Sequence, residues 1–201
     1  MKHPISVAIL ALSTLASLSA PRAQAQASPT ASRSLELSVF GGASGVYTGF
    51  HGGKNLSLTA GVDLGVRSFF GLRPFLEVRG TYPVHSGSED SQKDVLGGLK
   101  LAKYFGRVHP YADILFGRGA LTYVNGAIDP SGSTEYLENP TNVLSPGVGV
   151  DFALTENFDL KADAQYQRFN TPVTASGTLY AKPLTLAIVY RPTFHRIHHG
   201  R

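Results

Sequence analysis

Residues 56–67 alternate apolar and polar side chains without interruption. The apolar positions are Leu56, Leu58, Ala60, Val62, Leu64 and Val66, and the other register carries Asp63 and Arg67. Successive side chains of a β-strand point to opposite faces, so this segment predicts a strand with one apolar and one charged face. The pattern recurs along the chain between gaps marked by glycine and proline, which favours a sheet whose two faces meet different surroundings.

The chain begins with the features of a secretory signal peptide. Lys2 precedes an apolar stretch over residues 5–18, and small residues surround the expected cleavage after Ala25 or Ala27. The apolar stretch is shorter than the ~20 residues that a membrane-spanning helix needs, which disfavours the alternative of a transmembrane anchor. We therefore expect the folded part to begin after residue 27.

Composition excludes some classes of function. The chain has no cysteine, so its stability after export cannot depend on disulfides. Its formal net charge of +4 falls to about +2 once the basic residues of the signal peptide are removed. The basic residues are spread singly and are not interleaved with aromatic residues in a run, so we predict no nucleic-acid partner.

Period-two alternation predicts eight strands and no helix after the signal peptide. The expected ranges are residues 35–44, 56–68, 73–83, 94–104, 110–122, 145–155, 158–168 and 183–194. Short connections at 69–72, 105–109 and 156–157 alternate with longer polar ones at 45–55, 84–93, 123–144 and 170–182. An even-stranded meander of this kind has all its short turns at one end and its long loops at the other, as outer-membrane barrels do.

Alternation alone does not decide which face lies inside. A secreted lipocalin-like barrel buries the apolar register, whereas a membrane barrel turns it outward. Aromatic residues near both strand ends favour the membrane barrel, because they would form two interfacial girdles. The residues expected near the short turns are Phe69, Phe70, Phe75, Tyr104, Phe105, Tyr111 and Phe158. Those expected near the long loops are Tyr47, Phe50, Tyr82, Tyr123, Tyr166, Phe169 and Tyr180.

The charged register would then face the lumen. The predicted lumen charges are Asp63, Arg67, Glu77, Arg79, Lys100, Asp113, Asp151, Lys161, Asp163 and Arg191. Small residues of the same register include Gly61, Gly65, Gly98, Gly117, Gly147 and Gly149. The lumen of an eight-stranded barrel is only wide enough for side chains, so we assign the charges a structural role in filling it, not an ion path.

The hairpins at residues 104–111 and 149–163, with the last strand, resemble the small outer-membrane β-barrel superfamily of OmpA-type, OmpX-type and opacity-type proteins. The pattern Leu184-x-Leu186-x-Ile188-x-Tyr190, with Phe194 in register, resembles the terminal-strand signal read by the barrel assembly machinery. Pro192 and the basic tail after Phe194 depart from that signal. The resemblance implies an eight-stranded antiparallel up-and-down transmembrane barrel in the outer membrane, with both ends periplasmic.

Several polar groups invite a catalytic or metal-binding interpretation, and we favour a simpler one for each. His85 and Ser86 lie beside Glu89 and Asp90, but in a Gly/Ser loop with no rigid wall to fix a nucleophile. The tail histidines His195, His198 and His199 are expected to belong to a frayed terminus. The acidic loop residues Asp129, Glu135 and Glu138 match no calcium-loop spacing. We predict no catalytic, cofactor-binding or metal-binding residue.

The sequence therefore predicts four segments: a signal peptide at 1–27, a short lead at 28–34, an all-β outer-membrane barrel at 35–194 and a basic tail at 195–201. We expect a structural or surface-interaction protein that is not an enzyme, with outer-membrane lipids, the assembly machinery and a surface partner of the long loops as its contacts. One alternative is a barrel-borne lipid-modifying enzyme. Resemblance to lipid A deacylases would imply a histidine on a late strand, and the three predicted C-terminal strands have none. The other alternative is the lipocalin-like carrier.

Overall fold

The computed structural model describes residues 36–87 and 89–192. Its strands are β1 (Glu36–Tyr47), β2 (Lys54–Gly65), β3 (Leu72–His85), β4 (Asp90–Lys103), β5 (Val108–Ile128), β6 (Glu135–Ala153), β7 (Phe158–Gln165), β8 (Gln167–Asn170) and β9 (Thr178–Tyr190). In this part of the chain no helix is both long and apolar enough to cross a membrane. The predicted signal peptide, the lead at 28–34 and the tail at 195–201 lie outside the described residues.

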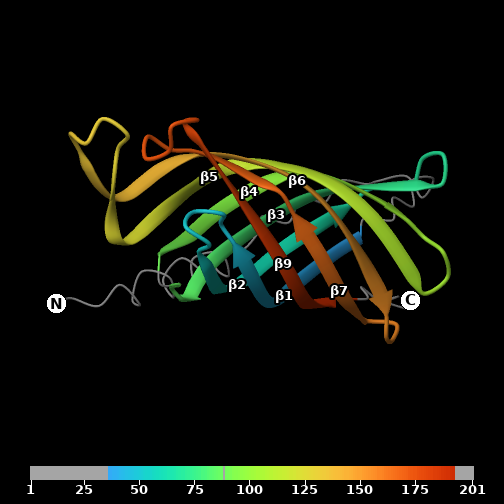
Figure 1. Ribbon diagram of the computed structural model, residues 1–201. Coiled ribbons are helices and arrows are strands. Elements are labelled where there is room, and N and C mark those ends of the chain that lie inside the picture. Colours follow the sequence, from blue (N-terminus) through green and yellow to red (C-terminus); the bar gives the residue numbers. More distant parts are fainter. Residues whose placement is uncertain (1–35, 88, 193–201) are drawn as a thin grey trace, which may run out of the picture. The chain divides into compact units, whose positions relative to one another are not determined.

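The strands form one closed antiparallel sheet. Strands adjacent in sequence pair from β1 to β7, and β9 pairs with both β7 and β1, which closes the sheet into a barrel (Figure 1). β7 and β8 act as one barrel strand, because each pairs with β6 on one side and β9 on the other. The predicted eight-stranded up-and-down barrel is thus confirmed.

Pro146 explains why the seventh barrel strand is divided. The strand predicted at 145–155 would have Pro146 near its start, but this proline lies inside β6, which begins at Glu135. β6 pairs with β8 through Val143 and Leu144 and resumes with β7 at Gly147, so the ladder breaks opposite Pro146. Proline has no amide hydrogen to donate to the ladder, and only its carbonyl is used, accepting a 2.9 Å hydrogen bond from Tyr166.

The expected long loop at 123–144 is mostly strand. β5 runs to Ile128 and β6 starts at Glu135, and their hairpin extends beyond the other connections (yellow in Figure 1). A register shift between Thr122 and Ala127 marks a bulge in this hairpin. Pro140 lies in a part of β6 that pairs only with β5 among the described residues, so its missing amide interrupts no second ladder.

The apolar register faces outward and the polar register inward. In β2, Leu58 is 56% exposed, whereas its neighbours Ser57 and Thr59 are buried. β9 alternates in the same way over its whole length. We call the side with connections 48–53, 86–89, 129–134 and 171–177 the loop end, and the side with 66–71, 104–107 and 154–157 the turn end.

Ten of the fourteen aromatic residues predicted for the girdles are not buried. Phe69, Phe70 and Phe105 are exposed at the turn end, and Tyr82 and Tyr180 at the loop end. The prediction was wrong for Phe75, Tyr111, Tyr123 and Phe169, which are at most 5% exposed. These four belong to the inward register of their strands, so proximity to a strand end did not decide the direction of the side chain.

Candidate functional site

Eight of the ten predicted lumen charges are buried on the inward register. They are Asp63, Glu77, Arg79, Lys100, Asp113, Asp151, Lys161 and Asp163, none more than 7% exposed. They come from β2 to β7, so the closed sheet brings together residues that are up to a hundred positions apart in sequence. Buried charges are tolerated only when they are paired and hydrogen-bonded.

Arg79 is the centre of one group of carboxylates. Its Nη1 donates to Asp163 Oδ1 at 2.7 Å, its Nη2 lies 3.6 Å from Asp113 Oδ2, and its guanidinium also pairs with Glu77. The Tyr111 hydroxyl donates to Asp163 Oδ2 at 2.8 Å. One guanidinium thus bridges carboxylates from three strands, which ties β3, β5 and β7 together across the lumen.

Lys100 and Lys161 form the second group. Lys100 Nζ lies 2.6 Å from Asp63 Oδ2 and 3.4 Å from Asp151 Oδ2. Lys161 Nζ lies 3.9 Å from Asp63 Oδ2 and 3.8 Å from Asp151 Oδ1. Both ammonium groups also face the ring of Tyr111, at 4.3 and 4.6 Å from its centroid. The two lysines share two aspartates and one aromatic ring, and these contacts offset the repulsion between their like charges.

Glycines of the same register make space for these long side chains. A Cβ at Gly61 would lie 2.5 Å from the Phe40 ring, and one at Gly149 would lie 2.3 Å from the Tyr111 hydroxyl. A Cβ at Gly147 would overlap the amide of Gln165. Each glycine therefore faces a large inward side chain, as expected for an interior filled by side chains.

Two predicted lumen charges lie elsewhere. Arg67 is exposed, because β2 ends at Gly65 and the alternation of the sequence continues two residues beyond the strand. The lumen position predicted for Arg67 is therefore wrong. Arg191 follows β9 at the turn end, where its side chain is 18% exposed and pairs with Asp159 and Glu36. It is at the rim of the lumen, not inside it.

The interior near the loop end contains an apolar cluster that was not predicted from the sequence. This loop-end apolar cluster consists of Val46, Leu96, Leu115, Leu121, Tyr123, Ala127, Val143, Phe169, Val173, Leu179 and Ala181. Leu115, Leu121, Val143 and Phe169 are fully buried. A signal was present in runs such as Ile114-Leu115-Phe116, in which both registers are apolar. Such a run indicates a strand buried on one face and in contact with lipid or protein on the other.

The loop-end polar groups have partners that differ from those of a catalytic set. Asp90 accepts a 2.7 Å hydrogen bond from Thr48, and Glu89 lies 3.8 Å from His51, so neither acid is engaged with His85. Among the described residues no group of His, Cys, Asp and Glu side chains is arranged to hold a metal ion. The tail histidines lie outside those residues.

The acidic residues of the β5–β6 hairpin are also engaged locally. Asp129 accepts hydrogen bonds from the hydroxyls of Ser131 and Ser133 and from the Ser133 amide. These hydrogen bonds, led by that of Ser131, lower the pKa of Asp129 below its ordinary value. Glu138 pairs with Lys93 at 3.0 Å on the outward face. Asp129 therefore shapes a tight turn at the tip of the hairpin.

The sequence profile of the outer membrane protein beta-barrel domain matches residues 8–191. The chain belongs to this family. Its barrel is therefore located in the outer membrane, with the outward apolar register in contact with lipid. No curated protein matches its sequence.

Three solved structures show a similar arrangement of strands. Neisserial surface protein A is 16% identical and covers 78% of this chain and 96% of its own, with a TM-score of 0.49. The attachment invasion locus protein Ail of Yersinia pestis is 12% identical and covers 79% and 97%, with a TM-score of 0.47. The outer membrane enzyme PagL is 14% identical and covers 77% and 99%, with a TM-score of 0.48.

Proposed function

We propose that this outer-membrane barrel has a structural and surface-interaction role and is not an enzyme, with its lumen filled by side chains and its contacts made by the loop end. The observation that carries the proposal is that two groups of buried side chains follow one another along the interior. The ion-paired groups around Arg79 and Lys161 are followed, toward the loop end, by the loop-end apolar cluster. A continuous water path would have to pass both groups of side chains, and polar side chains buried beside the apolar cluster are engaged with one another, as in the 2.9 Å hydrogen bond from Gln92 to Gln167.

The β5–β6 hairpin is the part of the loop end best suited to contact a partner. It extends beyond the other connections and exposes Val124, Ile128 and Leu137, with Leu137 66% exposed (Figure 1). Residues 135–142 of β6, which lead to the tip of the hairpin, pair only with β5 among the described residues. One backbone edge of this segment is therefore open to strand addition. Exposed apolar side chains on an extended hairpin support protein contact.

The remaining contacts follow from the membrane location. The outward residues Leu184, Leu186, Ile188 and Tyr190 of β9 form the terminal-strand pattern that we propose the barrel assembly machinery reads. We also propose that the loop end is extracellular and the turn end periplasmic, which is the usual orientation of such barrels.

Single cysteines in a chain that has none test the orientation and the exposure of the hairpin. In intact cells, Leu137→Cys should react with a membrane-impermeant maleimide, whereas Phe70→Cys should react only after the outer membrane is permeabilised. Both side chains are exposed in the structure, so the pair differs in the end of the barrel and not in burial. The reverse pattern of labelling would contradict the proposal.

Conductance tests the filled lumen separately. The purified protein in planar lipid bilayers should show no steady channel current. A steady current that changes when Lys161 is replaced by methionine would overturn the filled lumen, because Lys161 is fully buried among the lumen charges.

A further inference from the structure

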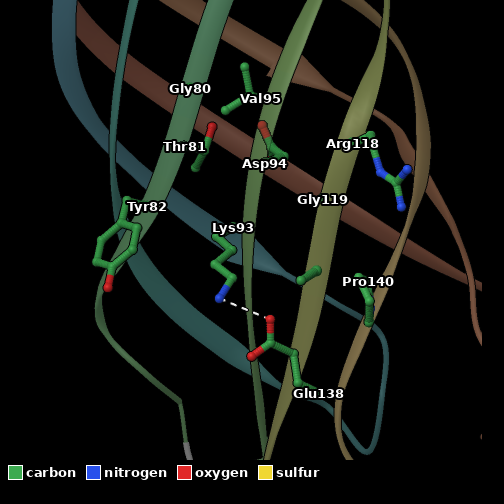
Figure 2. A pocket seen from close by; sticks show the side chains of 11 residues that line it. Gly80, Thr81, Tyr82, Lys93, Asp94, Val95, Arg118, Gly119, Glu138 and Pro140 are labelled. Atoms are coloured by element: carbon green, nitrogen blue, oxygen red, sulfur yellow. Dashed lines mark ion pairs between the residues drawn. The ribbon is translucent and has the colours of Figure 1, made fainter. Parts of the chain in front are cut away.

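A depression of about 480 Å³ lies on the outward surface of β3 to β6, close to the loop end. Figure 2 shows Tyr82, Val95, Arg118 and Pro140 around it. Gly80 accounts for the hollow, because it is the outward position between exposed Val78 and Tyr82 and has no side chain. The volume is within the ~300–1,000 Å³ of typical small-ligand sites.

The outward residues of β5 indicate where the depression lies along the membrane normal. From Val108 to Phe116 this register carries no charge, and Arg118 follows ten residues after Val108. With a rise of ~3.4 Å per residue and a tilt of ~40°, ten residues advance about 26 Å along the membrane normal. The apolar band of such barrels is ~25 Å tall, so Arg118 stands where acyl chains meet head groups.

The outward residues of β4 independently show the same ten-residue spacing across the apolar band. Lys103 and Lys93 are ten residues apart on its outward face, and the outward residues between them include Val95 and Leu99, which are exposed. Lys93 and Arg118 thus lie at similar heights on neighbouring strands, on the border of the same depression. The depression joins the apolar band to the head-group layer.

The two cations differ in their protein partners. Lys93 Nζ pairs with Glu138 Oε1 at 3.0 Å, shown as the dashed line in Figure 2. Within residues 36–87 and 89–192, no side chain forms an ion pair or hydrogen bond with the Arg118 guanidinium. An arginine has five donors and is always charged, so at this height Arg118 requires acceptors from outside the protein.

We propose that this depression binds a phosphorylated lipid of the outer leaflet, with one acyl chain over Gly80 and Val95 and a phosphate on Arg118. The guanidinium fits a phosphate in a bidentate manner, and Lys93 adds a second positive charge. Tyr82 is 64% exposed at the border, where an amphipathic ring suits the interface between acyl chains and head groups. The leaflet rests on the proposed orientation of the loop end, whereas the binding itself does not.

Native mass spectrometry of the full chain in detergent micelles tests the binding without reference to orientation. The probes are bis-phosphorylated lipid A, the same lipid without phosphates, and inorganic phosphate. The protein should prefer the phosphorylated lipid, and Arg118→Gln should weaken its binding about tenfold and remove the preference. Arg168→Gln is the matched control, since Arg168 is exposed on outward β8 and does not line the depression.

Substitutions at two glycines test the acyl-chain site, one inside the depression and one outside it as a control. Gly80→Ile should fill the hollow and weaken the binding of both the phosphorylated and the unphosphorylated lipid. The protein should tolerate the change, because a Cβ at this position meets only Asp94 O at 3.7 Å and Val95 Cγ2 at 4.0 Å. Gly97→Ile should have no effect, since Gly97 has similar space, with its nearest atom at 3.7 Å, but does not line the depression.

Glu138→Gln should strengthen binding, because it releases Lys93 from its ion pair. An increase in affinity cannot come from a failure to fold. Should Arg118→Gln not form a barrel, as judged by gel mobility without boiling, the Gly80→Ile and Gly97→Ile pair together with Glu138→Gln decides the question. Equal losses for Arg118→Gln and Arg168→Gln, equal effects of the two isoleucine variants, or binding of inorganic phosphate as tight as that of the lipid would each overturn the proposal.

Discussion

Replacing Arg79 with methionine tests the structural role of the lumen charges. Methionine keeps much of the length of the side chain but removes its charge and its donors. Arg79 bridges Asp163 at 2.7 Å and Asp113 at 3.6 Å, and also pairs with Glu77. The variant therefore leaves three buried carboxylates without their shared cation.

Removing one partner from a buried ion pair typically destabilises a protein by about 3–5 kcal/mol, because the remaining charge is buried without compensation. The Arg79 side chain is only 3% exposed, so little solvent screening reduces this effect. We expect Arg79→Met to lower the free energy of unfolding by about that amount, which is roughly two to four powers of ten in the equilibrium constant.

Arg67→Met is the matched control. Both arginines were predicted to face the lumen, but Arg67 is exposed after the end of β2, so its variant should stay within about 0.5 kcal/mol of the parent. Urea unfolding of the barrel refolded into lipid vesicles, followed by far-ultraviolet circular dichroism, measures both. Equal stabilities of the two variants would refute the structural role of the Arg79 group.

Three further predictions concern other parts of the barrel. Gly61→Ala should destabilise the barrel by about 1–3 kcal/mol in the same unfolding assay, because its Cβ meets a ring atom at 2.5 Å, whereas Gly41→Ala, which has no atom within 4 Å of its Cβ, should have little effect. Replacing residues 125–136 with a two-residue turn should leave the gel mobility shift on boiling unchanged, because the loop-end apolar cluster is supplied mainly by the barrel strands; loss of the shift would contradict this. Hydrogen bonds, led by that of Ser131, lower the pKa of Asp129, so the turn at residues 129–134 should stay ordered above the ordinary value near 3.8 and lose its order as the pH falls through the lowered pKa. Amide exchange of residues 129–134 at pH 5 and pH 2.5 measures this order. Equal protection at the two pH values would contradict the prediction.

The sequence could predict the barrel because the two registers differ so strongly. Leu58 and Val62 are apolar, Asp63 is charged, and their alternation survives in the structure as exposed and buried side chains. The strand that contains them ends earlier than the pattern, however, which is why Arg67 was misplaced. Alternation reports the face of a residue only while the backbone remains extended, and the pattern alone does not show where the strand ends.

Other features depended on pairing between distant strands. The break opposite Pro146 and the length of the β5–β6 hairpin depend on how backbone groups pair between strands. Local composition does not determine this pairing. The contacts of Lys161 with Asp63 and Asp151 join β7 to β2 and β6 across the lumen. The sequence predicts that such charges pair, but which partners meet depends on barrel closure.

If the apolar register faces lipid and the charged register a filled interior, outward positions of the strands should be reached by a quencher dissolved in the bilayer. The chain has no tryptophan, so single tryptophans can be introduced at Leu58, Val62 and Leu76, which are all exposed, and at Ile128 in the hairpin as a control. In vesicles of dibrominated lipid, we expect strong quenching of fluorescence at the first three positions and weak quenching at Ile128. Quenching at Leu58, Val62 and Leu76 no stronger than at Ile128 would contradict it.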